Sequence, residues 1–426
     1  MTNVIAPIAA LLTSVALLLM GNGLQGTLLP VRASIEAFSP VDIGVMGSSY
    51  FIGFAIGCLY GPRMLKRAGH IRTFAAMVAV ASSAVLAHAV IVSPVLWWLL
   101  RAVTGLCFAV LYLVIESWLN EKASNENRGL VFSIYTIINL TVITIGQMML
   151  MLDEPEDFPL FALSSILLSL AAVPVAMTTS AAPEAVAAVK IRLIHLYRLS
   201  PVGMIGCLAV GLANGAFWGL APVYAKGESG DLADVAIFMS VTVIAGAVGQ
   251  WPIGRYSDRI DRRRVMLVSC FGAAAAAGGL TFLIPLWQNS LFVFGFLFGM
   301  FAFPLYSLCV AHTNDRIDPD GYVEAASGLL MAYAAGAVIG PLFASFVMQL
   351  MGTSGLFVFT LCIHVATAIF IVYRISMRSS PPLEEHIPFG DALRVAQTVS
   401  TVDPLPKLQT SEADTNAKSS QNENAG

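Results

Sequence analysis

Long apolar stretches separated by short polar connections fill the chain from its beginning to about residue 375. A helix that crosses a bilayer needs about 20 mainly apolar residues, and twelve stretches reach this length. The pattern predicts spans at residues 6–31, 41–64, 71–93, 95–119, 129–152, 159–178, 201–225, 233–254, 264–286, 288–311, 323–350 and 353–374. It therefore predicts an all-α integral membrane protein with twelve transmembrane helices.

The composition agrees with the bilayer as solvent. Apolar residues make up 57% of the chain and charged residues only 12%, whereas soluble domains average about 25% charged residues. Mean hydropathy is +0.78. The net charge of −3 gives no basis for nucleic-acid binding. We expect the first stretch to be a span rather than a secretory signal peptide, because no basic segment precedes it.

The basic residues predict the orientation. Of 23 Lys and Arg residues, 20 lie in the even-numbered loops or in the tail after the last span. Only Arg32 and Lys226 lie in the odd-numbered loops, and Arg101 lies inside a span. Because cytoplasmic loops carry the excess of basic residues, we expect an inner (plasma) membrane protein with both termini in the cytoplasm.

The chain contains an internal repeat. Residues 22–72 and 214–264 align without gaps at an offset of 192 and share 15 identities, Asn22 with Asn214 among them. The offset equals six spans with their loops. The repeat predicts two six-helix bundles, residues 1–178 and 201–375, joined by a cytoplasmic loop at 179–200 and followed by a disordered tail at 376–426. Repeated bundles with a binding site between them are typical of secondary transporters.

The repeated asparagines lie midway along the first span of each bundle. An amide at this depth needs the bundle interior or a water-filled cavity. Two interpretations stay open for Asn22 and Asn214, a cavity lining and an ordinary helix-packing notch. Further polar or aromatic residues within spans are candidate cavity linings: Gln25, Tyr112, Asn139, Trp218 and Tyr306.

The loop after the eighth span, "GRYSDRIDRRR", resembles the G-x-x-x-D-R-x-x-R-R signature of the major facilitator superfamily. The matching positions are Gly254, Asp258, Arg259, Arg262 and Arg263. The resemblance implies the twelve-helix fold of that superfamily and a latch between its two halves. We call the two loops that carry this pattern the latch loops.

The latch loop after the second span, "GPRMLKRAGHIR", departs from the signature. Lys66 replaces the acidic residue, whereas Arg67, Gly69 and Arg72 are kept. The resemblance implies a contact between the acidic residue of the signature and a helix end, and with Lys66 in that position we do not expect this copy to make it.

Other elements are similar to those of superfamily members. Arg101 and the glycine four residues later resemble an R-x-x-x-G element of proton-coupled members, and "ESWLN" at 116–120 resembles the YcaD-like branch. A glycine–proline element typical of antiporters occurs in the eleventh span instead of the fifth, where one glycine is kept. We expect these residues to pack helices closely: Gly146, Gly336, Gly340 and Pro341.

Two charged side chains are predicted deep in the membrane, Arg101 and Glu116. Both lie on the fourth span, about 22 Å and about 60° apart, so they share a helix face. A charge within the membrane is costly and marks a functional site by default, and a desolvated carboxyl can take up a proton near neutral pH. We predict that these residues couple transport to protons. The alternatives are an Arg101 that extends to the interface or pairs with carbonyl groups of a neighbouring span, and an interfacial Glu116 that anchors the next loop.

The sequence predicts a secondary active transporter that moves a small molecule by alternating access, with proton-coupled export by antiport as the favoured mode. The alternative is a proton-coupled uptake symporter for a small metabolite, and a non-transporting receptor or scaffold is a remote third. Neither a nucleotide-binding signature nor a metal-ligand spacing is present. We therefore expect no cofactor, metal or enzymatic activity. The expected partners are the substrate, protons and the lipid bilayer, and the superfamily resemblance implies a monomer.

Overall fold

The computed structural model describes residues 8–123, 127–177, 192–284, 287, 289–318, 321–377 and 388–390. Within them, twelve helical segments are long and apolar enough to cross a membrane, which confirms the predicted number of spans. The helices are α2 (Ala9–Ile35), α3 (Pro40–Ala68), α4 (His70–Val90), α5 (Pro94–Lys122), α6 (Arg128–Met148), the short η2 (Met149–Leu152), α7 (Pro159–Ala176), α8 (Leu193–Leu199), α9 (Pro201–Ser229), α10 (Leu232–Ser257), α11 (Arg262–Phe282), α12 (Ser290–Ala302), α13 (Leu305–Asn314), α14 (Tyr322–Met351) and α15 (Gly355–Met377).

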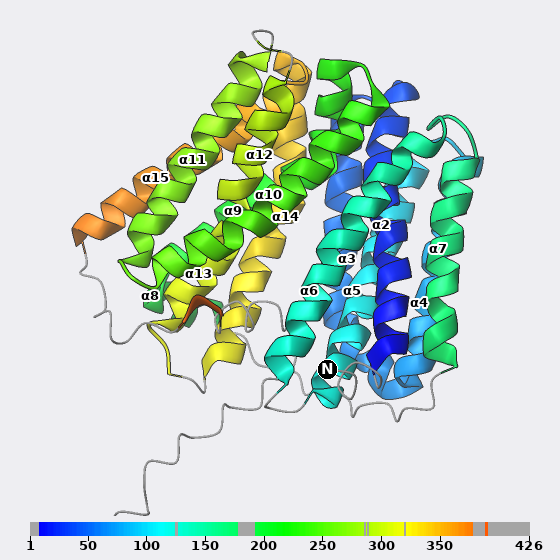
Figure 1. Ribbon diagram of the computed structural model, residues 1–426, viewed down its shortest axis with the longest axis horizontal. Helices are drawn as coiled ribbons and strands as arrows, with labels where there is room; N and C mark the ends of the chain where they lie inside the picture. Colours follow the sequence, from blue (N-terminus) through cyan, green and yellow to red (C-terminus); the bar gives the residue numbers. More distant parts are fainter. Residues whose placement is uncertain are drawn as a thin grey trace, which may run out of the picture.

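The helices form two groups. Figure 1 draws α2 to α7 on the right and α9 to α15 on the left, and α2 starts at the lower end of the view. We call this lower end the basic end, because both latch loops lie there, and the other the opposite end. The bundle limits at 178 and 201 stay predictions, because residues 178–191 lie outside the described chain. The tail beyond Met377 also lies outside the described chain, apart from residues 388–390.

Local sequence explains where the helices start and turn. The Ser39 hydroxyl accepts a hydrogen bond from the Asp42 backbone N–H and the Asp42 carboxylate accepts one from the Ser39 N–H, a reciprocal cap before Pro40. Gly69 joins α3 to α4 with a φ of 79°, which favours glycine.

Three prolines modify the predicted spans. Pro30 and Pro222 lie inside α2 and α9, which continue beyond them to Ile35 and Ser229, past the span ends at 31 and 225. Membrane helices tolerate such prolines, since neighbouring groups satisfy the freed carbonyls. Pro304 instead separates α12 from α13 within the tenth span, because it supplies no N–H to the helix.

Glycines allow the helices of each group to approach closely. A Cβ at Gly146 would collide with the backbone oxygen of Met20, so α6 touches the α2 backbone. Cβ atoms at Gly336 and Gly340 would likewise collide with backbone oxygens of α9, at Leu208 and Leu212. The closest helix pairs of the two groups, α3 with α5 and α9 with α14, depend on such contacts.

The two groups meet near the opposite end. A Cβ at Gly44 would collide with the Ser345 side chain and lie 2.7 Å from the Pro341 carbonyl oxygen. A Cβ at Gly47 would lie 3.3 Å from the Gly219 Cα. Pro341, expected to pack helices, therefore lies in the contact between α3 and α14. Toward the basic end α6 and α10 diverge (Figure 1).

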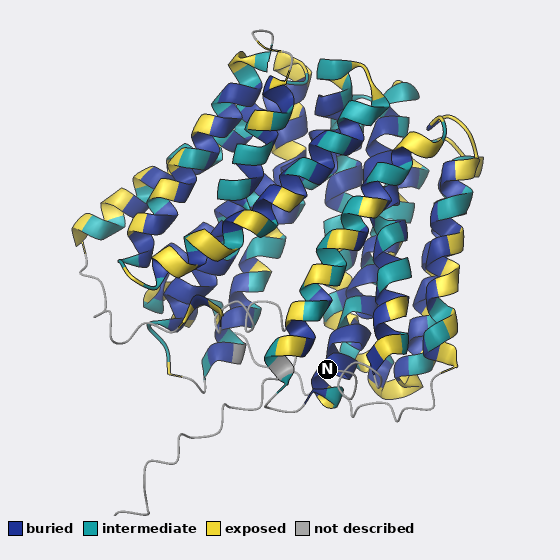
Figure 2. Ribbon diagram, viewed as in Figure 1, coloured by how far each residue is buried: buried dark blue, intermediate teal, exposed yellow. Residues whose placement is uncertain are grey.

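The outer faces of the helices carry the exposed apolar residues. Large side chains such as Leu59, Leu99, Trp251 and Phe343 are at least 60% exposed, and Figure 2 shows exposed positions along the outward sides of both groups. In water this surface would be strongly unfavourable. The chain is therefore a multi-pass membrane protein.

Candidate functional site

Arg101 lies over an aromatic ring of the neighbouring helix. Its guanidinium carbon is 4.5 Å from the centre of the Tyr50 ring on α3, a cation–π contact. Within the described residues, the Arg101 Nε has no hydrogen-bond acceptor and no carboxylate lies within ion-pair distance of this side chain. The close packing of α3 on α5 that brings Tyr50 near arises at Gly105, where a Cβ would collide with the Tyr50 carbonyl oxygen.

Glu116 is buried on the same helix, with 8% of the residue exposed. It lies within electrostatic range of Cys58 on α3, Tyr112 one turn earlier on α5, and Tyr135 on α6. The carboxylate therefore faces the other helices of its group rather than lipid. Tyr112 also lies within electrostatic range of Tyr50, the residue that contacts Arg101.

An asparagine pairs with a tyrosine in each half of the molecule. In α6 the Asn139 amide donates a hydrogen bond to Tyr135, and its Oδ1 has no partner among the described residues. In the other half the Asn214 amide of α9 donates to Tyr333 of α14, and its Oδ1 likewise lacks a described donor. The Tyr306 ring packs edge-on against Tyr333 at 5.2 Å. The predicted Asn139, Asn214 and Tyr306 thus belong to small polar clusters.

The predicted residues of α2 lie on different faces of the helix. Asn22 shares a face with Gly26, where a Cβ would meet no atom within 4 Å, so this face borders open space. Gly23, in contrast, packs against Ile143 of α6. Gln25 is completely buried, and neither amide atom has a described hydrogen-bond partner.

Trp218 occupies the position in α9 that corresponds to Gly26 at the repeat offset of 192. Its ring stacks on Phe303 at 5.9 Å and 17°. The repeat therefore places a large ring in one half where the other half has no side chain.

The latch loop between α10 and α11 forms a buried ionic cluster. Arg262 is 1% exposed, and its guanidinium donates two hydrogen bonds, of 2.6 and 3.2 Å, to the Asp315 carboxylate at the end of α13. It also donates to the Ser257 hydroxyl at 3.0 Å and to the Asp258 carboxylate at 3.2 Å. The cluster thus joins the ends of α10, α11 and α13.

The other charged residues of this loop do not join the Arg262 cluster in the same way. Arg263 pairs with Asp261 at 2.8 Å. Partial burial alone would raise the pKa of Asp261, but hydrogen bonds from the Arg263 side chain and backbone outweigh it and hold that pKa below its usual value. Arg259 is exposed.

The latch loop between α3 and α4 is exposed. The Lys66, Arg67 and Arg72 side chains reach solvent, and no ion pair involves them within the part of the chain that the structure describes. His70, which aligns with Arg262 in the repeat, is buried instead, with its Nε2 3.1 Å from the Ser117 hydroxyl. Without an acidic residue at position 66, this copy lacks the charge that accompanies Arg262 in the other copy.

A family model for the Major Facilitator Superfamily matches residues 11–329 and 203–409 of the chain. The chain belongs to the major facilitator superfamily. As a superfamily member it is a transporter, and it is not an enzyme.

Relatives by sequence agree with the predicted branch of the superfamily. The chain is 27% identical over 376 residues to the MFS-type transporter YcaD of Escherichia fergusonii, covering 88% of this chain and 96% of that protein. It is 25% identical over 351 residues to the YcaD protein of Salmonella arizonae, covering 82% and 91%.

Solved structures of the superfamily share the fold. The nucleoside transporter NupG superposes with a TM-score of 0.74 at 13% identity, covering 88% of this chain and all of that one. A bacterial homolog of the human lysosomal transporter Spinster, in an inward-facing and occupied conformation, gives 0.66 at 13% identity, covering 93% and 98%. A D-xylose–proton symporter gives 0.65 at 13% identity, covering 88% and 98%.

Several residues that contact the predicted site residues could not be identified from the sequence. Tyr50, Tyr135 and Tyr333 each contact a predicted site residue, but aromatic residues are common in spans and the hydropathy pattern does not mark them. Asp315 follows Arg262 by 53 residues and carries no local motif. For His70 a signal existed, since the repeat aligns it with Arg262.

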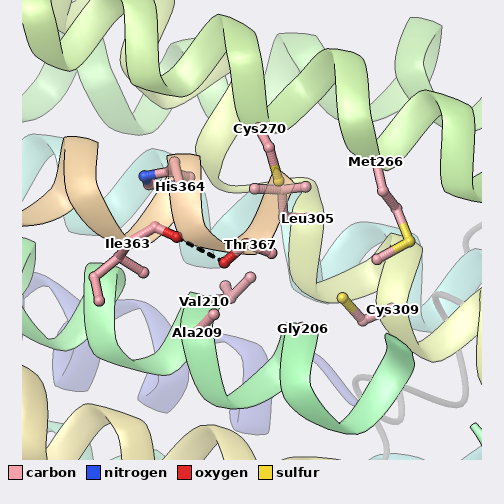
Figure 3. A pocket seen from close by; sticks show the side chains of 10 residues that line it. All are labelled: Gly206, Ala209, Val210, Met266, Cys270, Leu305, Cys309, Ile363, His364 and Thr367. Carbon is pink, nitrogen blue, oxygen red and sulfur yellow. Dashed lines mark hydrogen bonds between the residues drawn. The ribbon is translucent and has the colours of Figure 1, made fainter. Parts of the chain in front are cut away.

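A small pocket lies within the group formed by α9 to α15. Figure 3 shows it lined mainly by apolar and sulfur-containing side chains, and the Thr367 hydroxyl donates to the Ile363 carbonyl. The Nδ1 of His364 is 2.7 Å from the Thr360 carbonyl, a bond within its own helix. Within the described residues, His, Cys, Asp and Glu form no group that could hold a metal ion.

Proposed function

We propose that the protein is a proton-coupled secondary transporter that moves a small molecule by alternating access, with export by antiport as its mode. The observation that carries the coupling proposal is the placement of Arg101 and Glu116 on one face of α5. Tyr50 of α3 lies against Arg101, and Tyr112 and Tyr135 lie within electrostatic range of Glu116. Charged groups within the membrane mark a functional site by default, and a buried carboxyl that takes up and releases a proton can couple transport to the proton gradient.

Alternating access is supported by how the two halves meet. Glycines of α3 contact α14 and α9 near the opposite end, whereas α6 and α10 diverge toward the basic end. We assign the basic end to the cytoplasm by the excess of Lys and Arg there. In this assignment the structure is a cytoplasm-open state, the protein acts as a monomer in the inner membrane, and both termini are cytoplasmic.

The proposed substrate contacts come from both halves. Asn22 and the open space beside Gly26 form the contact on α2, and Asn214 and Trp218, in the matching repeat positions, form the contact on α9. The Asn214 amide oxygen, which has no partner among the described residues, offers a hydrogen-bond acceptor, and the Trp218 ring offers an apolar surface. These groups suit a small, partly apolar molecule. Uptake by symport is the alternative mode, and the D-xylose–proton and fucose–proton symporters share the fold.

The Glu116→Gln variant tests proton coupling. Because glutamine keeps the size of the side chain but cannot bind or release a proton, we expect transport driven by an imposed pH gradient to fall about tenfold. Exchange of labelled for unlabelled substrate should continue, since it needs no net proton movement. The measurement is flux in proteoliposomes, with a substrate found by screening small amphipathic compounds.

The matched control is Glu121→Gln, an exposed carboxylate near the end of the same helix, which should leave both fluxes unchanged. Gradient-driven transport by Glu116→Gln at the wild-type rate would refute the assigned role. The direction of the gradient that drives accumulation separates antiport from symport.

A further inference from the structure

A short segment from beyond the last span packs back onto the basic end. Phe389, within the described segment 388–390, is only 6% exposed and belongs to an apolar cluster with residues of α8, α10 and α13. Its backbone N–H donates a hydrogen bond of 2.9 Å to the Asp258 carboxylate. Figure 1 draws the segment across α13. The contact fixes one part of the tail to the latch loop between α10 and α11.

The docking position depends on a glycine. The Phe389 ring occupies the space that a Cβ at Gly254 would take, since that Cβ would collide with the ring. The other latch loop offers neither feature: at the repeat offset Pro62 replaces Gly254 and Lys66 replaces Asp258. Only the loop between α10 and α11 therefore combines a notch with a carboxylate acceptor, and this is the loop that binds the tail segment.

The bound segment is also tied to the buried ionic cluster. Asp258 accepts hydrogen bonds from both the Phe389 N–H and Arg262, and Arg262 holds Asp315 on α13. Docking therefore adds a link to a cluster that already joins the ends of α10, α11 and α13.

The notch lies on the flank of α10 that has to move when the basic end closes. Gly249 and Gly254 lie on opposite sides of α10. Around the helix axis, Gly249 is about 120° from the exposed Arg255 in one direction and Gly254 is about 100° from it in the other. Gly249 packs against Met300 of α12, and Figure 1 places α12 and α6 on the two sides of α10. Because α6 and α10 touch near the opposite end and diverge here, closing the basic end brings the Gly254 flank toward α6.

We propose that the segment around Phe389 is an intramolecular wedge that binds the Gly254 notch and holds the transporter open at the basic end. Closure requires the ring to leave, so docking and closure compete for one surface. The proposal rests on the proposed alternating access. It adds a regulatory site, at which any factor that removes the segment favours the closed state.

Distances between spin labels across the basic end test the wedge. Labels at Ser133→Cys on α6 and Arg264→Cys on α11, both exposed positions, are introduced after replacing Cys58 and Cys362. We expect full-length protein in detergent or nanodiscs to populate mainly a long distance. Phe389→Ala should raise the ratio of short to long distances about tenfold, since it removes a buried aromatic ring.

A truncation after Met377 should produce the same shift, and Phe389→Leu, which keeps an apolar side chain, should produce a smaller one. These variants alter a surface segment, so melting temperatures should confirm that the helices remain folded. Unchanged distance distributions in both Phe389→Ala and the truncation would overturn the wedge. The distance measurement needs no substrate, so it can contradict the wedge without contradicting proton-coupled transport. Likewise, the flux result for Glu116→Gln does not affect the distances measured here.

Discussion

Replacing Arg101 by alanine is expected to lower transport at least about 100-fold while leaving the protein folded. The guanidinium contacts the Tyr50 ring at 4.5 Å, and its Nε lacks a described acceptor. A membrane-buried cation without a structural counter-ion is unfavourable for folding. We expect the cost of burying the Arg101 charge to be offset during the transport cycle, when the substrate or a proton-transfer step supplies the missing partner.

The expected stability separates this role from a structural one. Removing one member of a buried ion pair leaves the other charge uncompensated and destabilises a protein by about 3–5 kcal/mol. No carboxylate within the described residues is paired with Arg101. Arg101→Ala should therefore melt within a few degrees of the wild type, and its proteoliposome flux should be near background.

Arg63→Ala is the matched control. Arg63 also lies over a tyrosine ring, that of Tyr60 at 5.5 Å, but both side chains are exposed on α3. Its removal should alter neither flux nor stability. Arg101→Ala protein that keeps more than half of the wild-type flux, with the same dependence on the pH gradient, would rule out a role for Arg101 in coupling.

Hydropathy and the internal repeat were sufficient to predict the membrane helices. The bilayer requires long apolar segments, so the number of spans follows from the sequence alone. The break at Pro304 was missed because average hydropathy does not register a lost backbone donor. The predicted spans end at residues 31 and 225, whereas α2 and α9 continue past Pro30 and Pro222 to Ile35 and Ser229, because packed neighbours allow a membrane helix to continue past a proline.

The site was only partly predictable, because a helix face does not identify its contacts. Spacing placed Arg101 and Glu116 on one face of α5, but Tyr50 and Tyr135 are contributed by other helices. The repeat correctly aligned the two latch loops yet gave no sign that one is buried and the other exposed. In the buried loop Arg262 pairs with Asp315 and Asp258 accepts a hydrogen bond from Phe389, which lies in a polar tail that the sequence predicts to be disordered.

The contact between the halves at the opposite end leads to the second large expected effect, in Gly44→Leu. A Cβ at Gly44 would collide with the Ser345 side chain and lie 2.7 Å from the Pro341 carbonyl oxygen. The serine can rotate, but the backbone oxygen can move only with α14. Four added carbons therefore have to separate α3 from α14. In the proposed alternating-access cycle this contact closes the opposite end, so the variant should remain open there and flux should fall to the level of empty liposomes.

Spin labels at Glu156→Cys and Asn289→Cys, exposed positions at the opposite end of the two halves, measure this opening. The distance between them should increase in Gly44→Leu and stay unchanged in Gly278→Leu, where a Cβ would meet only the Leu361 side chain, at 3.4 Å. A Gly44→Leu protein with wild-type distances and flux would contradict the proposal that this contact closes the opposite end. Loss of flux with unchanged distances would show that the opposite end still closes and that the substitution acts elsewhere. The combined result decides whether the glycine contact is merely close packing or the surface that must separate and re-form in each transport cycle.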